Sequence, residues 1–450
     1  MTLTTDVLIA GAGMGGLVAA RTAQEGGAQV LVLEKAPLVG GSAALSGGSV
    51  WTARDLEAWL SVQPEADPAL GKAHLDGFSE GIRWLASQGI ALQADTSPSV
   101  YRFPIVSYNL RPDARTALET LAARITGAGG TILVETALES AERDARGAVA
   151  GVRARGRDGA VEVKARAIVL ATGGFQANKE LRARYFGRWS DRMILRSNAY
   201  STGGGLLAAI AAGADAAGPF SRFYGHLVPA PPAEVGMHNF TRVTPYFSGH
   251  GVLLNLRGER FCDEYLGDEV SVHAVAHQDE ATAILVLDQR VRATYAGDPP
   301  EPDRLEATRL AGGVVLEAPS LTALVAAMMD RWNVPRAALA TLDTYARAAA
   351  SGDTSSLAVP RTGHLDPLAT APFYAVRYRA GITFTYGGAR VNRRAQALDT
   401  TGKPIPGLYA AGEITGLYYG VYTGATSVLR GAVFGRRAGL HAATYRRANV

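Results

Sequence analysis

The first 34 residues contain the pattern that most limits what this chain can fold into. An apolar run at 6–10 is followed by Gly11-Ala-Gly-Met-Gly-Gly16, by an alanine-rich segment at 17–25 and by a second apolar run at 29–34 that ends in a carboxylate. This order predicts a buried strand, a glycine turn, a helix and a second strand. The chain is therefore expected to begin with a βαβ unit of the kind that binds a dinucleotide.

Each conspicuous residue of this pattern has a separate physical role. Gly11 permits the tight turn, Gly13 lets the backbone approach a pyrophosphate, and Gly16 lets the helix pack closely on the strand. The N-terminus of the helix offers N–H groups to the phosphates. Glu34 falls at the distance at which a carboxylate accepts hydrogen bonds from a ribose diol.

Composition excludes several classes of protein. At 450 residues, 47% of them hydrophobic and 19% charged, the chain predicts two domains, or one domain with a large insertion. A net charge of +4 without a long basic run gives no reason to expect a nucleic-acid partner. Cys262 is the sole cysteine, so no disulfide within the chain and no cysteine metal site is expected. No transmembrane segment or leader is recognised, and we expect a cytoplasmic protein.

The chain organisation supports a divided first domain. A glycine- and serine-rich segment at 40–48 is interpreted as backbone that passes close to a cofactor, although a plain linker is the alternative. Residues 53–92 are expected to be helical. From about residue 222 to 380, clustered prolines and histidines indicate an inserted second domain, after which strand-like segments and a helix over 428–445 return to the first fold.

Several segments together resemble one family, the flavoproteins related to fumarate reductase, 3-ketosteroid dehydrogenase and tricarballylate dehydrogenase. The resemblance covers nearly the whole chain, and its segments occur in the family's order. They are Gly11–Gly16 with Glu34, Gly47-Gly48, Ala171–Phe175, Thr202–Gly205 with Gly213-Ala214, Gly258–Glu264 and Gly407–Glu413.

The resemblance implies an α/β fold: a Rossmann-like FAD-binding domain of the glutathione-reductase type with an inserted α+β capping domain. The implied boundaries are 1–221 and 382–450 for the FAD-binding domain and 222–381 for the capping domain, which would form the substrate site. By the same resemblance, Glu413 would lie near the ribityl chain and the N-terminus of the last helix near the pyrimidine edge of the flavin. The residues expected to bind FAD are Gly11, Ala12, Gly13, Met14, Gly15, Gly16, Glu34, Lys35, Gly41, Ser42, Ser46, Gly47, Gly48, Ala137, Ala171, Thr172, Gly173, Gly412, Glu413, Thr426, Ser427, Val428 and Leu429.

Three departures from the family pattern limit the implied chemistry. The proton-delivering arginine of fumarate reductases is missing from 265–271, where Gly267 is near the expected place. The family's His-Thr pair is here Phe384-Thr385, and its carboxylate-clamping arginine is replaced within 422–426. Fumarate reduction is therefore not expected, and the segments at 380–388 and 418–424 look more like those of tricarballylate dehydrogenase relatives.

Members of the family that bind FAD covalently attach it through a histidine before the pair that corresponds to Gly47-Gly48. No histidine occurs between Met1 and Ala73. We therefore expect noncovalent FAD.

Four residues are candidates for catalysis. Tyr422 matches the tyrosine of the ketosteroid dehydrogenase Tyr-Pro-Gly segment and is a candidate donor to the substrate oxygen; a packing tyrosine is the alternative. His226 lies near the place where fumarate reductases carry a substrate-facing histidine, although an isolated histidine is more often structural. Arg260 is either a proton relay or anion ligand, or a structural partner of Asp263 or Glu264. His250 is a weaker candidate.

The expected activity is FAD-dependent dehydrogenation, or the reverse reduction, of a CH–CH bond next to a carbonyl or carboxyl group of a small organic substrate. Such chemistry needs a base or acid for the α-hydrogen, hydride transfer with the flavin, and a donor to the enolate-like oxygen. An electron acceptor or donor is implied without being identified. The alternatives are a flavin oxidase acting on another type of bond and a noncatalytic flavin-binding redox partner.

Overall fold

The structure, a computed structural model, describes residues 1–95, 105–297, 302–363, 365–417, 419, 422 and 426–445. The chain divides into two units. The first unit comprises Met1–Leu181, Ser197–Arg222 and Phe384–Val450, and the second comprises Arg182–Arg196 and Phe223–Thr383. The insertion expected at 222–381 thus lies almost wholly in the second unit, which also contains an earlier segment that sequence reasoning left in the first.

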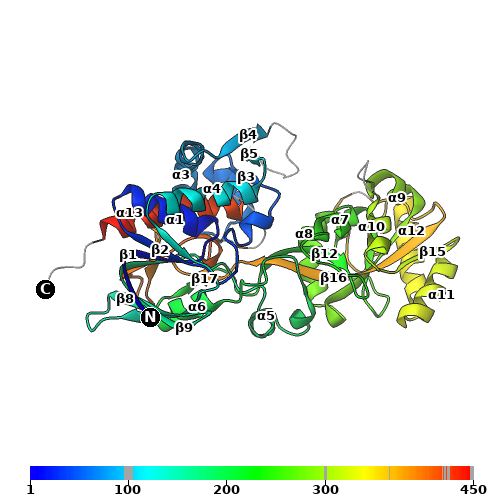
Figure 1. Cartoon of the computed structure of the whole chain (residues 1–450). Coiled ribbons are helices and arrows are strands. Elements are labelled where there is room, and N and C mark those ends of the chain that lie inside the picture. The colour runs from blue at the N-terminus through cyan, green and yellow to red at the C-terminus, as the bar shows by residue number, and fades with distance from the viewer. Residues whose placement is uncertain are drawn as a thin grey trace. The chain divides into compact units, whose positions relative to one another are not determined.

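The first unit is built on a mainly parallel sheet of eight described strands (Figure 1). Its order is β18-β19-β9-β1-β2-β6, with β8 paired to β9 and β7 paired to β8. The strands are β1 (Thr2–Ala10), β2 (Val30–Leu33), β6 (Thr131–Leu133), β7 (Ala137–Arg143), β8 (Val149–Gly156), β9 (Gly159–Leu170), β18 (Gln396–Leu398) and β19 (Pro404–Ala410). The first two strands run parallel, with Val7 opposite Val30, as expected for a βαβ unit.

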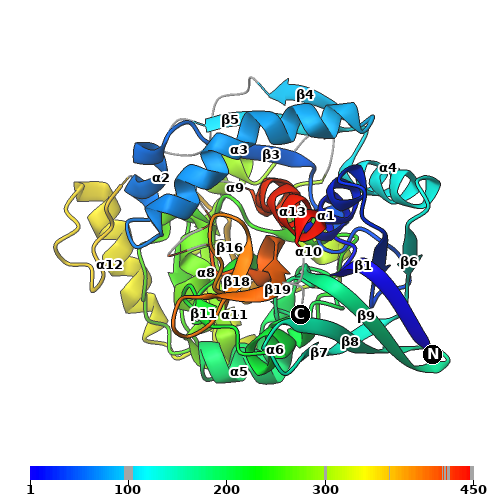
Figure 2. The same ribbon diagram turned by 90° about the vertical axis from the view of Figure 1, so that its left-hand side faces the viewer.

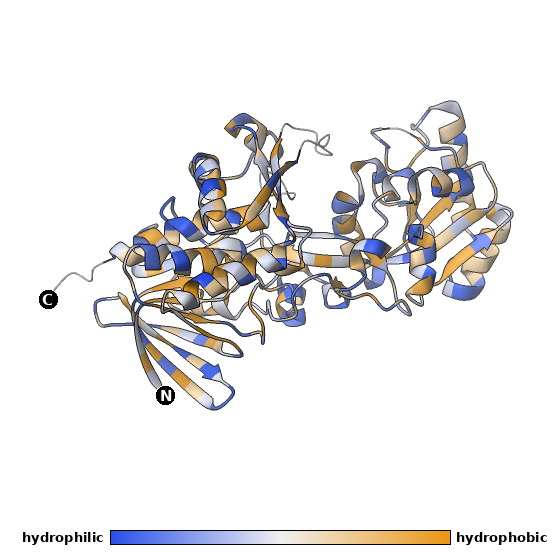
Figure 3. Cartoon of the chain, turned by 45° about the horizontal axis from the view of Figure 1, so that its top comes forward, coloured by the Kyte–Doolittle hydropathy of each residue, from blue (hydrophilic) through white to orange (hydrophobic). Residues whose placement is uncertain are grey.

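Burial along these strands explains their sequence. Val7 to Ala10 and the whole of β2 are buried, because the centre of a parallel sheet is covered on both faces. Residues 159–166 of β9 alternate between exposed and partly or fully buried positions, and the strand is then fully buried at Ala167–Leu170. The strands beside the N-terminus accordingly show bands of hydrophilic and hydrophobic residues in Figure 3.

Helices α1 (Met14–Glu25) and α13 (Ser427–Thr444) lie side by side, as both ribbon views show (Figures 1 and 2). Glycines on α13 make this approach possible. A Cβ atom on Gly435 would lie 2.6 Å from the carbonyl oxygen of Gly15, and one on Gly439 would lie 2.3 Å from that of Ala19. The C-terminal helix is therefore packed directly on the helix that follows the glycine turn.

The segment 53–92, which is expected to be helical, is mostly helical, but it forms two separate helices and its two ends belong to strands. Asp55 and Asp67 each cap a separate helix through their carboxylates. The flanking strands belong to a small antiparallel sheet in the order β3-β5-β4. The elements are β3 (Ser49–Ala53), α2 (Leu56–Val62), α3 (Pro68–Ser87), β4 (Ala91–Asp95) and β5 (Ile105–Arg111).

The remaining elements of the first unit are short, apart from one helix of 14 residues, α4. They are α4 (Ala114–Gly127), α5 (Lys179–Phe186, which continues into the second unit), α6 (Gly204–Ala211), β11 (Ala216–Ala217) and β17 (Gly388–Ala389), with 3₁₀ turns at Ala43–Leu45 and Gly412–Ile414.

The second unit has its own sheet, in which β16 is the central strand. The order is β10-β16-β14-β13, and β12 and β15 also pair with β16. Apolar side chains of β13 and β14 pack with those of α11 and α12 to form a separate core. The elements are β10 (Ile194–Leu195), β12 (Phe223–Pro229), α7 (Phe240–Val243), β13 (Val252–Leu254), α8 (Asp268–Ala276), β14 (Thr282–Asp288), α9 (Gln289–Tyr295), α10 (Arg304–Leu310), β15 (Val315–Ala318), α11 (Leu321–Trp332), α12 (Ala338–Ser351) and β16 (Phe373–Thr385), with 3₁₀ turns at Ser190–Arg192, Ser248–His250, Glu264–Leu266 and Asp279–Ala281.

Across the described residues, none of the helices has the length and apolar character needed to cross a bilayer.

Candidate functional site

The glycine turn has the geometry that its sequence predicts. Gly11 has a φ of +104°, and a Cβ atom there would lie 2.3 Å from the carbonyl oxygen of Ala171. A Cβ atom on Gly16 would lie 1.8 Å from the carbonyl oxygen of Gly11. Any larger residue at either position would collide with backbone, so the turn requires glycine at both.

Helix α1 begins without a capping side chain among the described residues. Its N-cap is Gly13, and no acidic residue occupies its first turn. A Cβ atom on Gly13 would have a single near neighbour, the carbonyl oxygen of Gly40 at 3.9 Å. A helix N-terminus that no side chain caps, approached by bare backbone, suits the phosphates of a dinucleotide.

Glu34 is bonded to the glycine turn itself. Its Oε2 accepts a hydrogen bond from Ala12 N–H at 2.7 Å, and its Oε1 accepts one from Ala36 N–H at 2.7 Å. Burial raises the pKa of this carboxyl group, and the backbone hydrogen bonds oppose that shift. A carboxylate has further lone pairs for a ribose diol, so Glu34 both braces the turn and remains a candidate ribose ligand.

Lys35 follows Glu34 in the chain, and Ala137 is next to a residue that is bonded to the Glu34 backbone. Burial lowers the pKa of Lys35, and its ammonium donates to Thr202 Oγ1 at 2.7 Å. Ala137 begins β7 directly after Thr136, whose N–H donates to the Glu34 carbonyl oxygen. Residues expected to bind the cofactor thus come from three parts of the first unit: the glycine turn, the residues that follow β2 and the start of β7.

The segment at 40–48 runs past the glycine turn. Gly40 N–H donates to the Ala12 carbonyl oxygen at 2.8 Å, and a Cβ atom on Gly41 would lie 3.4 Å from the Gly13 Cα. Ser42 Oγ lies 2.9 Å from Ser197 Oγ, whereas Ser46 Oγ bonds locally. Gly48 has a φ of +77°, and a Cβ atom on Gly47 would meet no atom within 4 Å.

The end of β9 joins the same region. Ala171 N–H donates to the Ala10 carbonyl oxygen, which brings Thr172 and Gly173 beside the end of β1. A Cβ atom on Gly173 would lie 3.1 Å from Ser201 Oγ. The carboxyl ends of neighbouring parallel strands are where such folds bind their ligands.

Glu413, which follows Gly412, is the centre of a polar cluster in the first unit. Its Oε1 accepts from Thr385 N–H at 3.1 Å and its Oε2 from Gln176 Nε2 at 3.4 Å. Burial raises the pKa of Glu413 to about 7, although hydrogen bonds and the charge of Arg430 act in the opposite direction. This carboxyl group can therefore hold a proton near neutral pH. Gln176 was missed by sequence reasoning, although it directly follows the Gly-Gly-Phe turn.

The N-terminus of α13 is bonded to Tyr422. Thr426 Oγ1 accepts from Leu429 N–H at 3.2 Å, and the Tyr422 hydroxyl oxygen accepts from Ser427 N–H at 3.1 Å. The Tyr422 ring meets Trp51 edge-on, with centroids 5.7 Å apart, and meets Phe384 at 5.1 Å. Val428 continues this first turn of α13. The residues at 418, 420–421 and 423–425, which carry part of the tricarballylate dehydrogenase resemblance, lie outside the described residues.

His226 is held on both ring nitrogens in the second unit. Nδ1 lies 2.7 Å from Asp268 Oδ2, and Nε2 lies 2.7 Å from the hydroxyl of Tyr224. The ring of Tyr246 meets the imidazole edge-on at 5.2 Å. His226 and Asp268 are each only 6% exposed, so the pair is shielded from water.

Asp268 was missed by sequence reasoning, although a signal was present. Gly267, the residue near the expected place of the lost arginine, has a φ of +87° and is the N-cap of α8. Asp268 follows it in the first turn, where a carboxylate is favoured by the helix dipole. Asp268 thus lies next to the expected place of the missing arginine, and its carboxylate binds His226.

Arg196 lies near the pair of His226 and Asp268, where its positive charge opposes the negative charge of Asp268. Its Nη1 donates to Thr383 Oγ1 at 2.7 Å, and the residue is 3% exposed. Burial lowers the pKa of His226; Asp268 raises it and Arg196 lowers it. Because Asp268 and Arg196 already compensate each other, a proton on His226 would leave a buried net charge, and the neutral imidazole is favoured.

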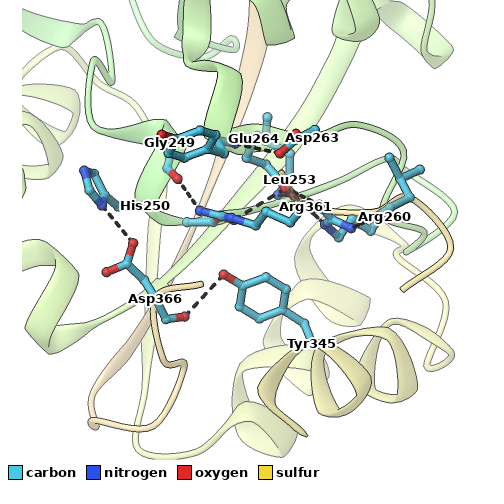
Figure 4. A network of polar contacts seen from close by, with 12 residues as sticks. Gly249, His250, Leu253, Arg260, Asp263, Glu264, Tyr345, Arg361 and Asp366 are labelled. Carbon is cyan, nitrogen blue, oxygen red and sulfur yellow. Dashed lines mark hydrogen bonds and ion pairs between the residues drawn. The ribbon is translucent and has the colours of Figure 1, made fainter. Parts of the chain in front are cut away.

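Arg260 lies in a buried ion-pair network (Figure 4). Its Nε and Nη2 donate to Glu264, the latter at 2.7 Å, and its Nη1 donates to the Val359 carbonyl oxygen. Arg361 lies beside the same carboxylate, with 3.5 Å between Nη1 and Oε2. Side-chain exposure is 3% or less for all three charged residues. These contacts favour the structural alternative for Arg260.

His250 pairs with a different acid. Its Nδ1 lies 2.8 Å from Asp366 Oδ2, which Figure 4 shows as a dashed contact, and its ring stacks on Tyr295 with centroids 3.6 Å apart. Arg290 binds the other oxygen of Asp366 at 2.6 Å. The geometry gives His250 a packed and ion-paired position.

Comparison with known proteins agrees with this geometry. The model of a family described as an FAD binding domain matches residues 6–429. A urocanate reductase of Eggerthella lenta is 28% identical over 98% of this chain and 75% of its own length. A 3-oxosteroid 1-dehydrogenase of Mycobacterium tuberculosis is 25% identical over 97% of this chain and 98% of its own length. The solved open conformation of a flavocytochrome c3 fumarate reductase is 26% identical and covers 98% of this chain and 78% of its own, with a TM-score of 0.75.

Proposed function

The chain belongs to the FAD binding domain family. We propose that this FAD-dependent oxidoreductase, which acts on CH–CH or C=C bonds, is specific for a small substrate in which that bond adjoins an uncharged carbonyl group. The reductase and dehydrogenase names of its relatives support the type of bond. The choice of an uncharged carbonyl rests on this chain's own residues.

The described residues fit FAD. The turn from Gly11 to Gly16 and the uncapped start of α1 suit the pyrophosphate, and Glu34 suits a ribose diol. Glu413 would meet the ribityl chain and the start of α13 the pyrimidine edge. Bound FAD supplies the two-electron acceptor or donor of the reaction.

The observation that carries the proposal is the hydrogen bond from Ser427 N–H to the Tyr422 hydroxyl oxygen. Because this oxygen accepts from the N–H at the positive end of a helix, its O–H bond is polarised. A phenol polarised in this way is a suitable donor to the oxygen of a carbonyl that becomes enolate-like. The edges of Trp51 and Phe384 fix the ring in place.

The uncharged nature of the substrate follows from the same positions. A dicarboxylate needs cations that pair with both ends. The places where the family pattern has a histidine and an arginine carry Phe384 and the uncharged segment 422–426. Phe384 and Tyr422 offer aromatic surface and a phenol hydroxyl group. We infer that a ketone or enone binds better than a dicarboxylate.

The test is anaerobic mixing of the yellow holoprotein with saturated and unsaturated ketones, acids and dicarboxylic acids. Loss of the oxidised flavin band identifies a compound that is dehydrogenated, and reoxidation of photoreduced flavin identifies one that is reduced. Response to ketones or enones supports the proposal. A response confined to dicarboxylates contradicts the substrate class, and a protein that binds FAD and responds to no compound supports a noncatalytic redox partner, for which an electron-transfer protein would be sought.

A further inference from the structure

A small cavity lies within the first unit, where α2 and α13 both pack against α3 (Figure 2). Trp59 of α2, His74 of α3 and Arg430 of α13 line it. All three side chains are buried, with exposed fractions of 4%, 1% and 1%. The cavity has room for about one water-sized group. A ligand here is therefore small, and it meets polar groups that are shielded from water.

Helix spacing explains why these side chains meet. Gly71 and His74 are three positions apart on α3 and so share a face. Arg430 and Phe434, four apart, share a face of α13 in the same way. The His74 ring centroid lies 5.3 Å from that of Trp59 and 6.5 Å from that of Phe434. A Cβ atom on Gly71 would lie 3.0 Å from Trp59 Nε1, so glycine lets the indole N–H edge lie against α3.

The buried polar atoms of the cavity are mainly hydrogen-bond donors. Within the described part of the chain, Trp59 Nε1 and both ring nitrogens of His74 have no hydrogen-bond partner. An indole and a guanidinium only donate, and a neutral imidazole carries an N–H on either nitrogen. Burial of such groups without an acceptor costs free energy. The lining therefore favours a ligand that accepts from several donors at once.

The charge of the buried lining is positive. Burial lowers the pKa of His74 to about 3, and the charges of Arg430 and Arg437 add to the shift, so the imidazole is neutral and the Arg430 guanidinium is the cation of the cavity. Glu413 interacts with Arg430, but burial raises the pKa of Glu413 to about 7 and so lets it hold a proton. Asp67 also lines the cavity, but it is exposed to water and caps α3 with its carboxylate. A buried cation favours an anion beside it.

The remaining walls decide the type of anion. Leu70, Leu417 and Phe434 line the cavity with apolar surface. Phosphate and sulfate are larger than a water molecule and need donors around several oxygens. A chloride or bromide ion is close to a water molecule in size, accepts from donors in any direction and tolerates apolar neighbours. A halide therefore fits the cavity better than an oxyanion.

We propose that this cavity is a halide site, in which one chloride ion accepts hydrogen bonds from the Arg430 guanidinium, the Trp59 indole N–H and one N–H of the His74 ring. The ion pairs with the buried arginine and links α2, α3 and α13 to one another. The site is independent of the proposed substrate and reaction, so its failure would leave the proposed function untouched.

The first experiment measures chloride binding to the holoprotein by the line width of ³⁵Cl NMR, at constant ionic strength with gluconate as the balancing anion. We expect broadening that bromide removes by competition and that sulfate does not remove. Trp59→Phe keeps an aromatic ring and removes one donor, so it should weaken chloride binding roughly 10-fold to 100-fold, the usual effect of a lost hydrogen bond to a charged group. Arg430→Met should abolish the broadening that bromide removes.

Trp84→Phe is the matched control. Trp84 also lies on α3 and is also buried, but its Nε1 donates to Glu25 at 2.8 Å. Its loss should leave chloride binding unchanged. Equal binding in the parent and Trp59→Phe, an equal loss in Trp84→Phe, or displacement by sulfate would overturn the proposal. If Arg430→Met does not fold, the two tryptophan variants decide the question.

The second experiment locates the ion. Crystals of the holoprotein grown in sodium bromide should give an anomalous difference peak in the cavity, in contact with Arg430, Trp59 and His74. A water molecule in the cavity, or bromide peaks at the protein surface alone, which are adventitious ions only, would overturn the proposal.

Discussion

The backbone N–H of Ser427 donates a hydrogen bond of 3.1 Å to the phenol oxygen of Tyr422. Ser427 is the first residue of α13, so the positive end of that helix lies at the tyrosine oxygen. The partial charge strengthens the phenol as a hydrogen-bond donor. Tyr422 is therefore suited to stabilise negative charge that develops on a substrate oxygen.

Replacement of Tyr422 by phenylalanine should slow flavin reduction by roughly 100-fold to 1,000-fold, or about 3 to 4 kcal/mol, because one oxygen donor is lost. FAD content should be retained, since the ring contacts with Trp51 and Phe384 do not need the hydroxyl. Anaerobic stopped flow with a reactive ketone is the measurement. Tyr409→Phe is the control, because that hydroxyl donates to the His441 carbonyl oxygen. Equal rates in Tyr422→Phe and the parent would make Tyr422 a packing residue.

Replacement of Glu34 by alanine should weaken FAD binding at least tenfold, since a carboxylate bonded to a ribose diol contributes on the order of 1.5 to 3 kcal/mol. The apoprotein should also lose stability, because Ala12 N–H and Ala36 N–H lose their buried acceptor. FAD fluorescence on reconstituted apoprotein and denaturant unfolding measure the two effects. Glu139→Ala, which removes an exposed partner of Arg155, is the control. An unchanged dissociation constant would place the ribose elsewhere.

The purified protein should contain one noncovalent FAD per chain. The histidine that would attach the flavin is missing before Gly47, and the chain has no histidine ahead of His74. Precipitation with trichloroacetic acid should release all of the yellow colour into the supernatant. Flavin that remains in the washed pellet would contradict noncovalent binding.

Fumarate and succinate should be poor substrates, because the cations that clamp and protonate a dicarboxylate are missing from their places in the family pattern. Among the arginines that could replace them, Arg260 is already engaged by Glu264, and Arg196 by Thr383 and Thr244. The assay is fumarate-dependent oxidation of reduced viologen. Steady turnover at ordinary enzyme rates of about 1 to 1,000 per second would refute the prediction.

His74 should make the fold sensitive to acid. Burial lowers its pKa to about 3, and the charges of Arg430 and Arg437 add to the shift, whereas the unfolded side chain titrates near 6.5. Below pH 6.5 the unfolded state therefore binds the extra proton, so stability is complete above that pH and falls as the pH is lowered toward 3. Between pH 6.5 and 5 the loss should be about 2 kcal/mol.

The measurement for His74 is the free energy of unfolding in denaturant at several pH values. His74→Leu should flatten the acid limb of the stability curve, whatever its effect at pH 7.5. His238→Leu, at an exposed position, should leave the limb unchanged. An identical pH dependence in the parent and His74→Leu would show that this histidine is protonated equally in both states.

The glycine turn could be predicted because its constraints are local. Gly11 has a positive φ of +104°, and a Cβ atom on Gly16 would lie 1.8 Å from the carbonyl oxygen of Gly11 in the same turn. The ion pair between Arg260 and Glu264 could likewise be named in advance as the structural alternative, because the two residues are only four positions apart in the sequence. The expectation that 53–92 is helical was confirmed for most of the segment, but its division was missed, because the capping carboxylates Asp55 and Asp67 begin two separate helices.

The sequence by itself determined the family, the cofactor and the residues that shape the glycine turn, because those depend on residue type and order over short distances. Only the tertiary structure decided which side chains bind one another over long separations. Asp268 binds His226 across 42 positions, and Glu413 binds Gln176 across 237. Such pairs depend on how strands and helices pack: the sequence marks Asp268 as an acid next to Gly267, but it does not relate that acid to a histidine on another element.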